Sequence, residues 1–215
     1  MIRCDDIFVD SDAYHLERIC RIIRKYDFCH LIGITFMGEG RRIWNRDKSK
    51  LPKIPLPRFF DNYRDRRITG EKFIGDNVQL LKTLNAEFDE NGAIPALHGL
   101  HHYHYNQLTP NKVRKELSEG IDLFNTLFNL RVKVFTPPFN AWNRRTELIC
   151  ENLGLTLDKC LVGFGLGLDE MKNSQIIQMA KEQSSVREVN YHPYHISNLE
   201  KFELYLKTRR KYGQF

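Results

Sequence analysis

Apolar residues along this chain recur with the helical period in some segments and form short continuous runs in others. Leu16, Ile19 and Ile23 share one face of a helix predicted over about 12–26, which Ser11 can cap. The same reasoning predicts further helices over about 78–88, 109–124, 143–153, 169–183 and 198–205. Short apolar runs predict strands over about 1–4, 30–36, 93–97, 132–135, 155–162 and 186–191.

Because predicted strands and helices alternate, we expect a parallel sheet with right-handed crossovers. Six strands are convincing, which is too few for a complete eight-stranded (β/α) barrel. At 215 residues, the chain can form one sizeable core and is too short for two ordinary domains. We therefore predict a single α/β domain over residues 1–215, with a long, basic loop insertion at 37–73.

Residues with chemically active side chains stand directly after the predicted strands. They are the Asp5–Asp6 pair, the run from His98 to His104, the Pro137–Pro138 turn and His192. In a (β/α) barrel, the C-terminal ends of the strands converge on one face, which carries the active site. The sequence therefore predicts one site built from these four segments.

The Asp5–Asp6 pair suits metal-dependent hydrolysis. One carboxylate can bind a divalent cation while its neighbour takes a proton from the activated water. Adjacent aspartates are also common in solvated turns and at helix N-caps, so the pair gains weight only together with the histidines.

Four of the seven residues from 98 to 104 are histidines. His98 and His102 are four positions apart, a spacing that places two imidazoles on one face of a helical turn and occurs in a known zinc motif. The pairs His98 with His101 and His101 with His104 are three apart and remain alternatives. Two imidazoles and a carboxylate are together a typical set of metal ligands.

His192 and the turn that contains two prolines complete the predicted site. His192 can donate a proton near neutral pH, although a lone histidine at a strand end is more often structural. The prolines fix the backbone so that the next N–H, that of Phe139, can point at a developing oxyanion. Phe139 and Trp142 can stack on a sugar ring, and we expect substrate contacts from Pro138, Asn140 and Trp142.

The order of these motifs resembles that of the polysaccharide deacetylase superfamily, the metal-dependent carbohydrate esterases. That family has an Asp-Asp pair, then His-x-x-x-His, then an Arg-Pro-Pro-Tyr-Gly-like turn and a late His-Pro-like element. The similar segments here are Cys4-Asp5-Asp6, His98-Gly99-Leu100-His101-His102, Thr136-Pro137-Pro138-Phe139-Asn140 and Tyr191-His192-Pro193. The resemblance covers about residues 2–195 and implies a distorted or incomplete (β/α) barrel of about seven strands.

The resemblance also implies a role for each matching residue. A divalent metal, usually zinc, would be held by Asp6, His98 and His102. Asp5 would be the general base, His192 the acid that protonates the leaving amine, and the Phe139 N–H the oxyanion donor. The implied reaction is the removal of an acetyl group from an N-acetylated sugar or glycan.

Three departures from the family pattern indicate a divergent member. Thr136 occupies the position of an arginine that often orients the base. Gly99 replaces a Ser or Thr, a change that we expect to matter little for ligation. The family's Asp-Trp element, which supports the catalytic histidine, is not evident, and Asp158 and Asp169 are both candidates for its role.

The net charge of +6 is concentrated in one segment. Residues 41–72 contain eleven Lys or Arg and four Asp or Glu, interleaved with aromatic residues. Such a segment is usually a solvated loop, but it can also bind an anionic ligand. One rival interpretation is therefore a non-catalytic protein that binds a glycan or nucleic acid on the same fold. Another is a non-haem iron oxygenase, which also uses two histidines and one carboxylate.

Other features bear on the setting of the protein. The sequence has no apolar run long enough to cross a bilayer and no recognisable secretory signal. Its five cysteines are scattered, odd in number and without a CxxC, which argues against a disulfide framework. We therefore expect a cytoplasmic enzyme that does not associate with membranes, and the sequence says nothing about its oligomeric state.

Overall fold

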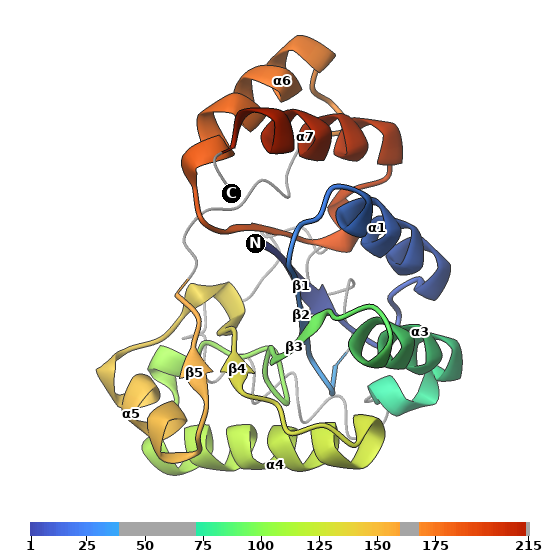
Figure 1. The fold of residues 1–215 in the computed structure, drawn as a ribbon. Helices are drawn as coiled ribbons and strands as arrows, with labels where there is room; N and C mark the ends of the chain where they lie inside the picture. Colours follow the sequence, from blue (N-terminus) through green and yellow to red (C-terminus); the bar gives the residue numbers. More distant parts are fainter. Residues whose placement is uncertain (39–71, 160–167, 214–215) are drawn as a thin grey trace, which may run out of the picture.

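The computed structural model describes residues 1–38, 72–159 and 168–213 and shows a curled sheet with helices packed around it (Figure 1). Within these residues the strands are β1 Ile2–Ile7, β2 His30–Ile34, β3 Ile94–Leu97, β4 Val134–Phe135, β5 Thr156–Leu157 and β6 Val189–Tyr191. The α-helices are α1 Ala13–Lys25, α3 Val78–Asp89, α4 Pro110–Phe128, α5 Arg144–Asn152, α6 Asn173–Glu182 and α7 Leu199–Tyr212.

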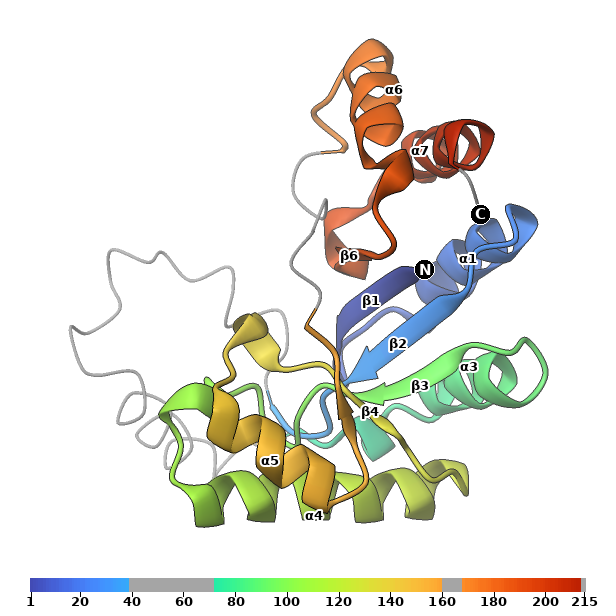
Figure 2. The same ribbon diagram turned by 60° about the vertical axis from the view of Figure 1, so that its left-hand side comes forward.

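The sheet runs in the order β5-β4-β3-β2-β1-β6, and each neighbouring pair is parallel. It curls into a half-barrel whose two edges, among the described strands, are β5 and β6 (Figure 2). The predicted fold class, a distorted (β/α) barrel, is confirmed, with six strands described rather than the expected seven. β1 lies between β2 and β6, so that Arg3 pairs with Leu31 on one side and Asn190 on the other.

The helices pack in neighbouring pairs against the sheet, α1 with α3, α4 with α5, and α6 with α7 (Figure 1). The predicted apolar face of α1 is buried. On α4, the fully buried Phe124 meets Phe36 edge-on, with ring centroids 5.1 Å apart. The helical periodicity of the sequence therefore predicted which helix faces form the core.

The ends of the elements differ in detail from the predictions. Asp12, and not Ser11, caps α1 by accepting a hydrogen bond from the backbone N–H of His15. The Ser11 hydroxyl instead accepts from the backbone N–H of Phe8, which stabilises the preceding turn. Thr109 caps α4 ahead of a proline at the first helical position. β4 and β5 are shorter than predicted, with two residues each.

Several expectations fall on residues that the structure does not describe. Residues 39–71, which hold most of the basic segment 41–72, lie outside the described ranges, as does Cys160. Cys4, Cys20, Cys29 and Cys150 are free thiols. Across the described ranges, no helix is both long enough and apolar enough to span a membrane.

His30 is a titratable group whose pKa is shifted by burial in the core. Its ring is buried against Tyr191, with Nε2 3.1 Å from the phenolic oxygen. Burial, reinforced by the positive charge of Arg24, lowers the pKa of His30 from its ordinary value near 6.5 to about 3. The folded protein therefore keeps this imidazole neutral under conditions in which the unfolded chain protonates it.

This difference predicts a defined loss of stability in acid. Because the pKa of His30 is depressed in the folded state, its contribution is fully present above pH 6.5 and is lost as the pH falls toward 3. The slope is about 1.4 kcal/mol per pH unit. Urea denaturation of wild type and His30→Gln should therefore show the difference in unfolding free energy shifting by about 2.5 kcal/mol in favour of the variant between pH 6.5 and 4.5. An unchanged difference would show that His30 is protonated inside the fold.

Candidate metal centre

A bulge in β1 sets the directions of the Asp5–Asp6 pair. Cys4 pairs with Ile32 of β2, but Ile7, three residues later, pairs with a residue only two positions further along β2. Asp6 accommodates the extra residue with φ at +62°. The two buried aspartates thus lie at the bulge inside β1, and not after a shorter strand as predicted.

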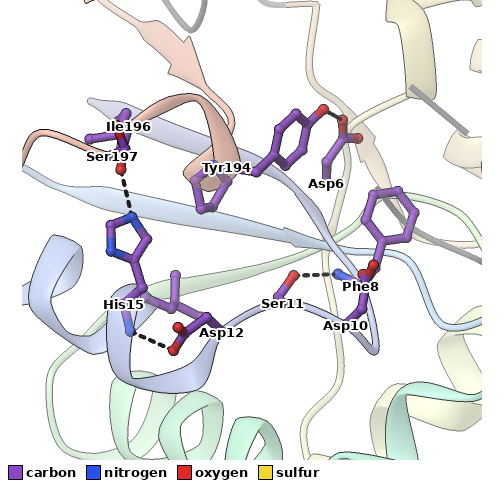
Figure 3. A pocket seen from close by; sticks show the side chains of 11 residues that line it. Asp6, Phe8, Asp10, Ser11, Asp12, His15, Tyr194, Ile196 and Ser197 are labelled. Atoms are coloured by element: carbon purple, nitrogen blue, oxygen red, sulfur yellow. Dashed lines mark hydrogen bonds between the residues drawn. The ribbon is translucent and has the colours of Figure 1, made fainter. Parts of the chain in front are cut away.

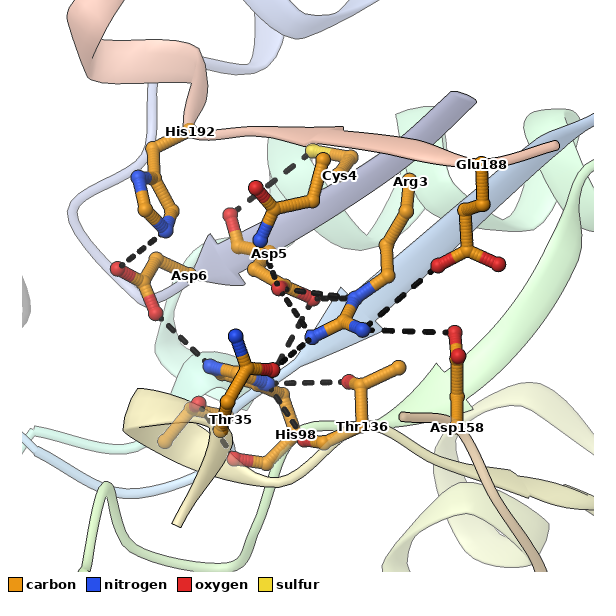
Figure 4. Close-up of polar contacts among 12 residues, drawn as sticks. Arg3, Cys4, Asp5, Asp6, Thr35, His98, Thr136, Asp158, Glu188 and His192 are labelled. Carbon is orange, nitrogen blue, oxygen red and sulfur yellow. Dashed lines mark hydrogen bonds and ion pairs between the residues drawn. The ribbon is translucent and has the colours of Figure 1, made fainter. Parts of the chain in front are cut away.

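The imidazole of His98 lies between the two carboxylates (Figure 4). Its Nε2 is 2.9 Å from Oδ1 of Asp6, and its Nδ1 is 3.6 Å from Oδ1 of Asp5. Nδ1 is also 2.6 Å from the carbonyl oxygen of Thr136. A hydrogen bond from Nδ1–H to that carbonyl leaves Nε2, the nitrogen that faces Asp6, as the one that a metal would bind once its proton is lost.

Asp6, His98 and His102 together could hold a divalent cation. Nε2 of His102 is 2.9 Å from the same Asp6 oxygen that His98 contacts. One ligand atom from each residue lies within 4.8 Å of the others, and all three residues are buried. Two imidazoles and one carboxylate match the donor set of catalytic zinc sites. The residues present therefore fit such a metal.

Contacts made by the loop between the two candidate ligand histidines distinguish among the histidine pairs that the sequence leaves open. Nδ1 of His101 lies 2.9 Å from the buried carboxylate of Glu116 on α4, which also accepts a hydrogen bond from the His101 backbone N–H. His104 stacks on an aromatic ring of the turn after β4. Of the three histidine pairs that the sequence allows, the structure places His98 and His102 at the candidate metal centre.

The charges of the centre shift its pKa values in opposite directions. Burial opposes ionisation of Asp6, but the charge of His102 and hydrogen bonds from both imidazoles hold its pKa well below its usual range. Burial also opposes protonation of His98, but the neighbouring aspartates outweigh it and raise the pKa. For His102 burial prevails and the pKa is lowered. A cation that binds Nε2 of His98 must displace the proton shared with Asp6, so metal binding should weaken in acid.

Arg3, which sequence analysis did not single out, holds Asp5. Nε of Arg3 lies 3.0 and 2.9 Å from the two carboxylate oxygens, and Nη2 lies 2.7 Å from Oδ2. Asn190 of β6 donates to Oδ2 at 3.1 Å. Burial raises the pKa of Asp5, but the charges of Arg3 and His98 outweigh it, and the pKa is lowered. Arg3 and Asp5 are two residues apart in a strand, so their side chains lie on the same face of the sheet. The sequence could therefore have revealed this contact.

His192 approaches the second oxygen of Asp6. Its Nε2 is 3.5 Å from Oδ2, and its side chain is 25% exposed. Tyr194, which sequence analysis also missed, donates its hydroxyl to the same oxygen at 2.7 Å. The rings of His192 and Tyr194 are nearly parallel, at 9°, with centroids 5.5 Å apart. The predicted acid therefore lies at the candidate metal centre and beside a tyrosine that helps to fix Asp6.

The two aspartates considered as supports for His192 have other partners. Asp158 pairs with Arg3 at 3.5 Å. Asp169 accepts hydrogen bonds from the backbone N–H groups of Ser197 and Asn198 and so fixes the segment that leads into α7. These contacts do not supply the predicted support.

The turn after β4 has a left-handed backbone at two successive residues, Phe139 with φ at +59° and Asn140 with φ at +49°. The ring of Phe139 stacks on His104, with centroids 3.9 Å apart, and meets His102 edge-on at 4.4 Å. The turn is therefore packed against a candidate metal ligand, and the residue predicted to donate its N–H to the oxyanion lies beside that ligand.

The residues predicted to contact substrate have different surroundings. Pro138 is buried. The side-chain oxygen of Asn140 accepts a hydrogen bond from Nη2 of Arg3 at 3.3 Å. The half-buried Trp142 has the ammonium group of Lys159 over its ring, 4.5 Å from the centroid. A role for these three residues in binding substrate stays a prediction.

A pocket of about 280 Å³ opens beside Asp6 (Figure 3). Phe8 and Tyr194 line it next to the candidate metal centre, and His15 of α1 lines it farther away. His15 is fixed there by a 2.6 Å contact between its Nε2 and the carbonyl oxygen of Ile196. This volume is at the lower end for ligand sites, so the pocket suits a small group.

Comparison with known proteins agrees with this geometry. The family model described as polysaccharide deacetylase matches residues 68–157, which include His98, His102 and the turn after β4. The comparison supports a divergent polysaccharide deacetylase. No curated protein matches this sequence.

Solved structures with a similar fold include active and inactive polysaccharide deacetylase relatives. A CE4 family pseudoenzyme from Bacillus anthracis aligns with a TM-score of 0.63 and 15% identity, over 99% of this chain and 61% of the pseudoenzyme chain. Its mutant with restored enzymatic activity aligns with a TM-score of 0.64 and 14% identity, over 98% and 61%. A family 4 carbohydrate esterase from Streptomyces lividans, in complex with acetate, gives 0.62 and 14%, over 96% and 85%.

The TM-scores show that this chain shares its fold with these structures. The chain spans about three fifths of the length of the pseudoenzyme that it matches.

Gly99 supports the loop that carries both candidate ligand histidines. Its φ is +101°, and a Cβ at this position would lie 2.5 Å from the carbonyl oxygen of His101. The replacement of the family's Ser or Thr by glycine leaves His98 and His102 together. The loop is therefore built around a residue without a side chain.

We expect Gly99→Ala to destabilise the protein and to weaken metal binding together. The left-handed backbone and the clash should cost about 1–3 kcal/mol, measured by thermal or urea unfolding. Zinc affinity, measured by calorimetry, should fall about tenfold or more because the histidines move. Gly92→Ala is the matched control, since Gly92 also has a positive φ of +70° but no atom within 4 Å of its added Cβ. If Gly99→Ala binds zinc as tightly as Gly92→Ala, the loop does not position the ligands.

Proposed function

We propose that this protein is a metal-dependent hydrolase that removes the acetyl group from an N-acetylated sugar or glycan. One observation carries the proposal: the ligand atoms of Asp6, His98 and His102 converge, and Asp5 stands beside them with separate partners of its own. The match to the polysaccharide deacetylase model supports the same class of reaction.

Asp6, His98 and His102 would hold the cation, and zinc is the metal that this donor set suits best. When bound, the cation would supply Lewis-acid activation of water and of the substrate carbonyl. The Nδ1 contact of His98 with Thr136 keeps its ring oriented for this role.

Asp5 is the proposed general base. Its pKa, which Arg3 and His98 lower against the effect of burial, keeps the carboxylate ionised at neutral pH, so it can accept a proton from water. Asp5 stands outside the group of candidate metal ligands. A hydrolase needs such an additional base, whereas the same two histidines and carboxylate in an iron oxygenase do not.

His192 is the proposed acid, which gives its proton to the departing sugar nitrogen. Its place beside Asp6 and its partial exposure suit a group that must reach substrate. The backbone N–H of Phe139 is the proposed oxyanion donor, because the packing of its ring against His102 holds this turn near the carbonyl to be attacked.

The proposed substrate occupies the pocket beside Asp6 and extends toward the turn after β4. Phe8 and Tyr194 offer aromatic surfaces in the pocket, and the half-buried Trp142 offers one just after the turn. Contacts from Pro138 and Asn140 belong to the same proposal. An anionic ligand at the basic segment 41–72 and a cytoplasmic location remain predictions.

The decisive measurement is the metal content of the purified protein together with acetate release from a panel of N-acetylated sugars. We expect stoichiometric zinc, or a comparable divalent metal, and acetate release that a chelator abolishes. His98→Ala and His102→Ala should each lose metal and hydrolysis together. His104→Ala, which removes a histidine of the same cluster, should keep stoichiometric metal. Survival of both metal and activity in the first two variants would refute the ligand assignment.

Asp5→Asn separates the base from the metal ligands. Because Asp5 lies outside the ligand group, this variant should keep its metal but lose about 10²- to 10⁴-fold in acetate release. Bound iron with turnover that depends on an oxoacid would instead favour the oxygenase. Salt-sensitive retention on nucleic acid without hydrolysis would favour the binding protein.

A further inference from the structure

We propose that Arg3 is the positioning residue that orients the Asp5 base, an inference that rests on the proposed function. The arginine that often orients the base in the resembling family is replaced here by Thr136. The hydroxyl of Thr136 lies 3.0 Å from Nδ1 of His98, and its carbonyl oxygen holds the same ring. The orientation of Asp5 must therefore come from another residue.

Arg3 meets Asp5 with one side of its guanidinium group. Nε lies 3.0 Å from Oδ1 and 2.9 Å from Oδ2, and Nη2 lies 2.7 Å from Oδ2. Two donor nitrogens thus hold both oxygens, which fixes the plane of the carboxylate as well as its position. The Arg3 side chain is only 1% exposed and that of Asp5 3%, so water hardly competes for this contact.

The other side of the guanidinium group faces the two edges of the described sheet (Figure 4). Nη1 lies 3.5 Å from Asp158, which follows β5, and 3.7 Å from Glu188, which precedes β6. Arg3, which lies on β1, is therefore contacted by residues next to both edge strands of the described sheet, β5 and β6.

The distances decide which partner matters most. Three carboxylates surround one guanidinium group, but those of Asp158 and Glu188 lie at 3.5 and 3.7 Å, whereas that of Asp5 is in direct hydrogen-bonding contact. A residue that only joined the sheet edges would show the opposite ranking. Arg3 thus acts mainly on Asp5.

Gly33 of β2 confines Asp5 from another direction. A Cβ at this position would lie 2.9 Å from Oδ1 of Asp5 and 2.9 Å from the hydroxyl oxygen of Thr136, so even a methyl group must displace the carboxylate or this hydroxyl. Asp5 is therefore held between the strand β2 and the prongs of Arg3. Gly33→Ala disturbs the same contact from the carboxylate side and leaves the arginine intact.

The test uses zinc-loaded protein and an N-acetylated sugar that the wild type hydrolyses. Arg3→Lys keeps the positive charge but loses the second prong, so kcat should fall about 10- to 100-fold while KM stays within about threefold and zinc stays stoichiometric. Gly33→Ala should lower kcat in the same manner. If Arg3→Lys does not fold, the kcat of Gly33→Ala is the measurement that tests the proposal.

The matched controls are Asp158→Asn and Glu188→Gln, which remove partners of Nη1 and leave the Asp5 contact intact. Their kcat should stay within about threefold of wild type even where their melting temperature falls. Wild-type kcat in both Arg3→Lys and Gly33→Ala would overturn the proposal. So would a kcat loss in either control as large as that in Arg3→Lys, because Arg3 would then be a general structural residue.

A crystal structure distinguishes failure of this inference from failure of the proposed function. If the wild type hydrolyses no acetylated sugar, the proposed function fails, and the zinc-loaded structures of wild type and Arg3→Lys still test Arg3. The Asp5 carboxylate should move by about 1 Å or more, or rotate out of plane, in the variant. An unmoved carboxylate would overturn the positioning role.

Discussion

The bulge in β1 is the constraint on which the rest of the candidate metal centre depends. In a regular strand, consecutive side chains point to opposite faces, so Asp5 and Asp6 could not both reach one imidazole. The extra residue and the left-handed conformation of Asp6 remove this restriction, and the two nitrogens of His98 then face one aspartate each. Aspartate tolerates the left-handed region better than most residues do, so the backbone cost is small beside the contacts that it permits.

The same arrangement explains how several charges remain buried together. Each carboxylate oxygen of Asp6 has its own partners, the two imidazoles on Oδ1 and Tyr194 with His192 on Oδ2. Arg3 and Asn190 likewise donate hydrogen bonds to the carboxylate of Asp5. Removal of one partner from such a network leaves a buried charge without compensation, at a typical cost of about 3–5 kcal/mol. The side chains are therefore held in position before any ligand arrives, as a catalytic site requires.

The structural neighbours show that this fold by itself does not determine activity. A pseudoenzyme, its reactivated mutant and a carbohydrate esterase all align with this chain at similar TM-scores. The difference between active and inactive members must therefore lie in particular side chains. In this chain, the position that often carries an arginine has Thr136, while an arginine contacts the candidate base from two residues earlier in its own strand.

The sequence by itself determined the alternation of strands and helices, the buried faces of α1 and α4 and the segments that supply the site, because all of these follow from local periodicity and from strand ends that share one face. Spacing left three histidine pairs open, and the choice of His98 with His102 came from Glu116, which draws His101 toward α4. The bulge at Asp6 and the approach of Tyr194 were likewise decided by tertiary structure. Each depends on how distant segments are registered against β1, and no local pattern contains that register.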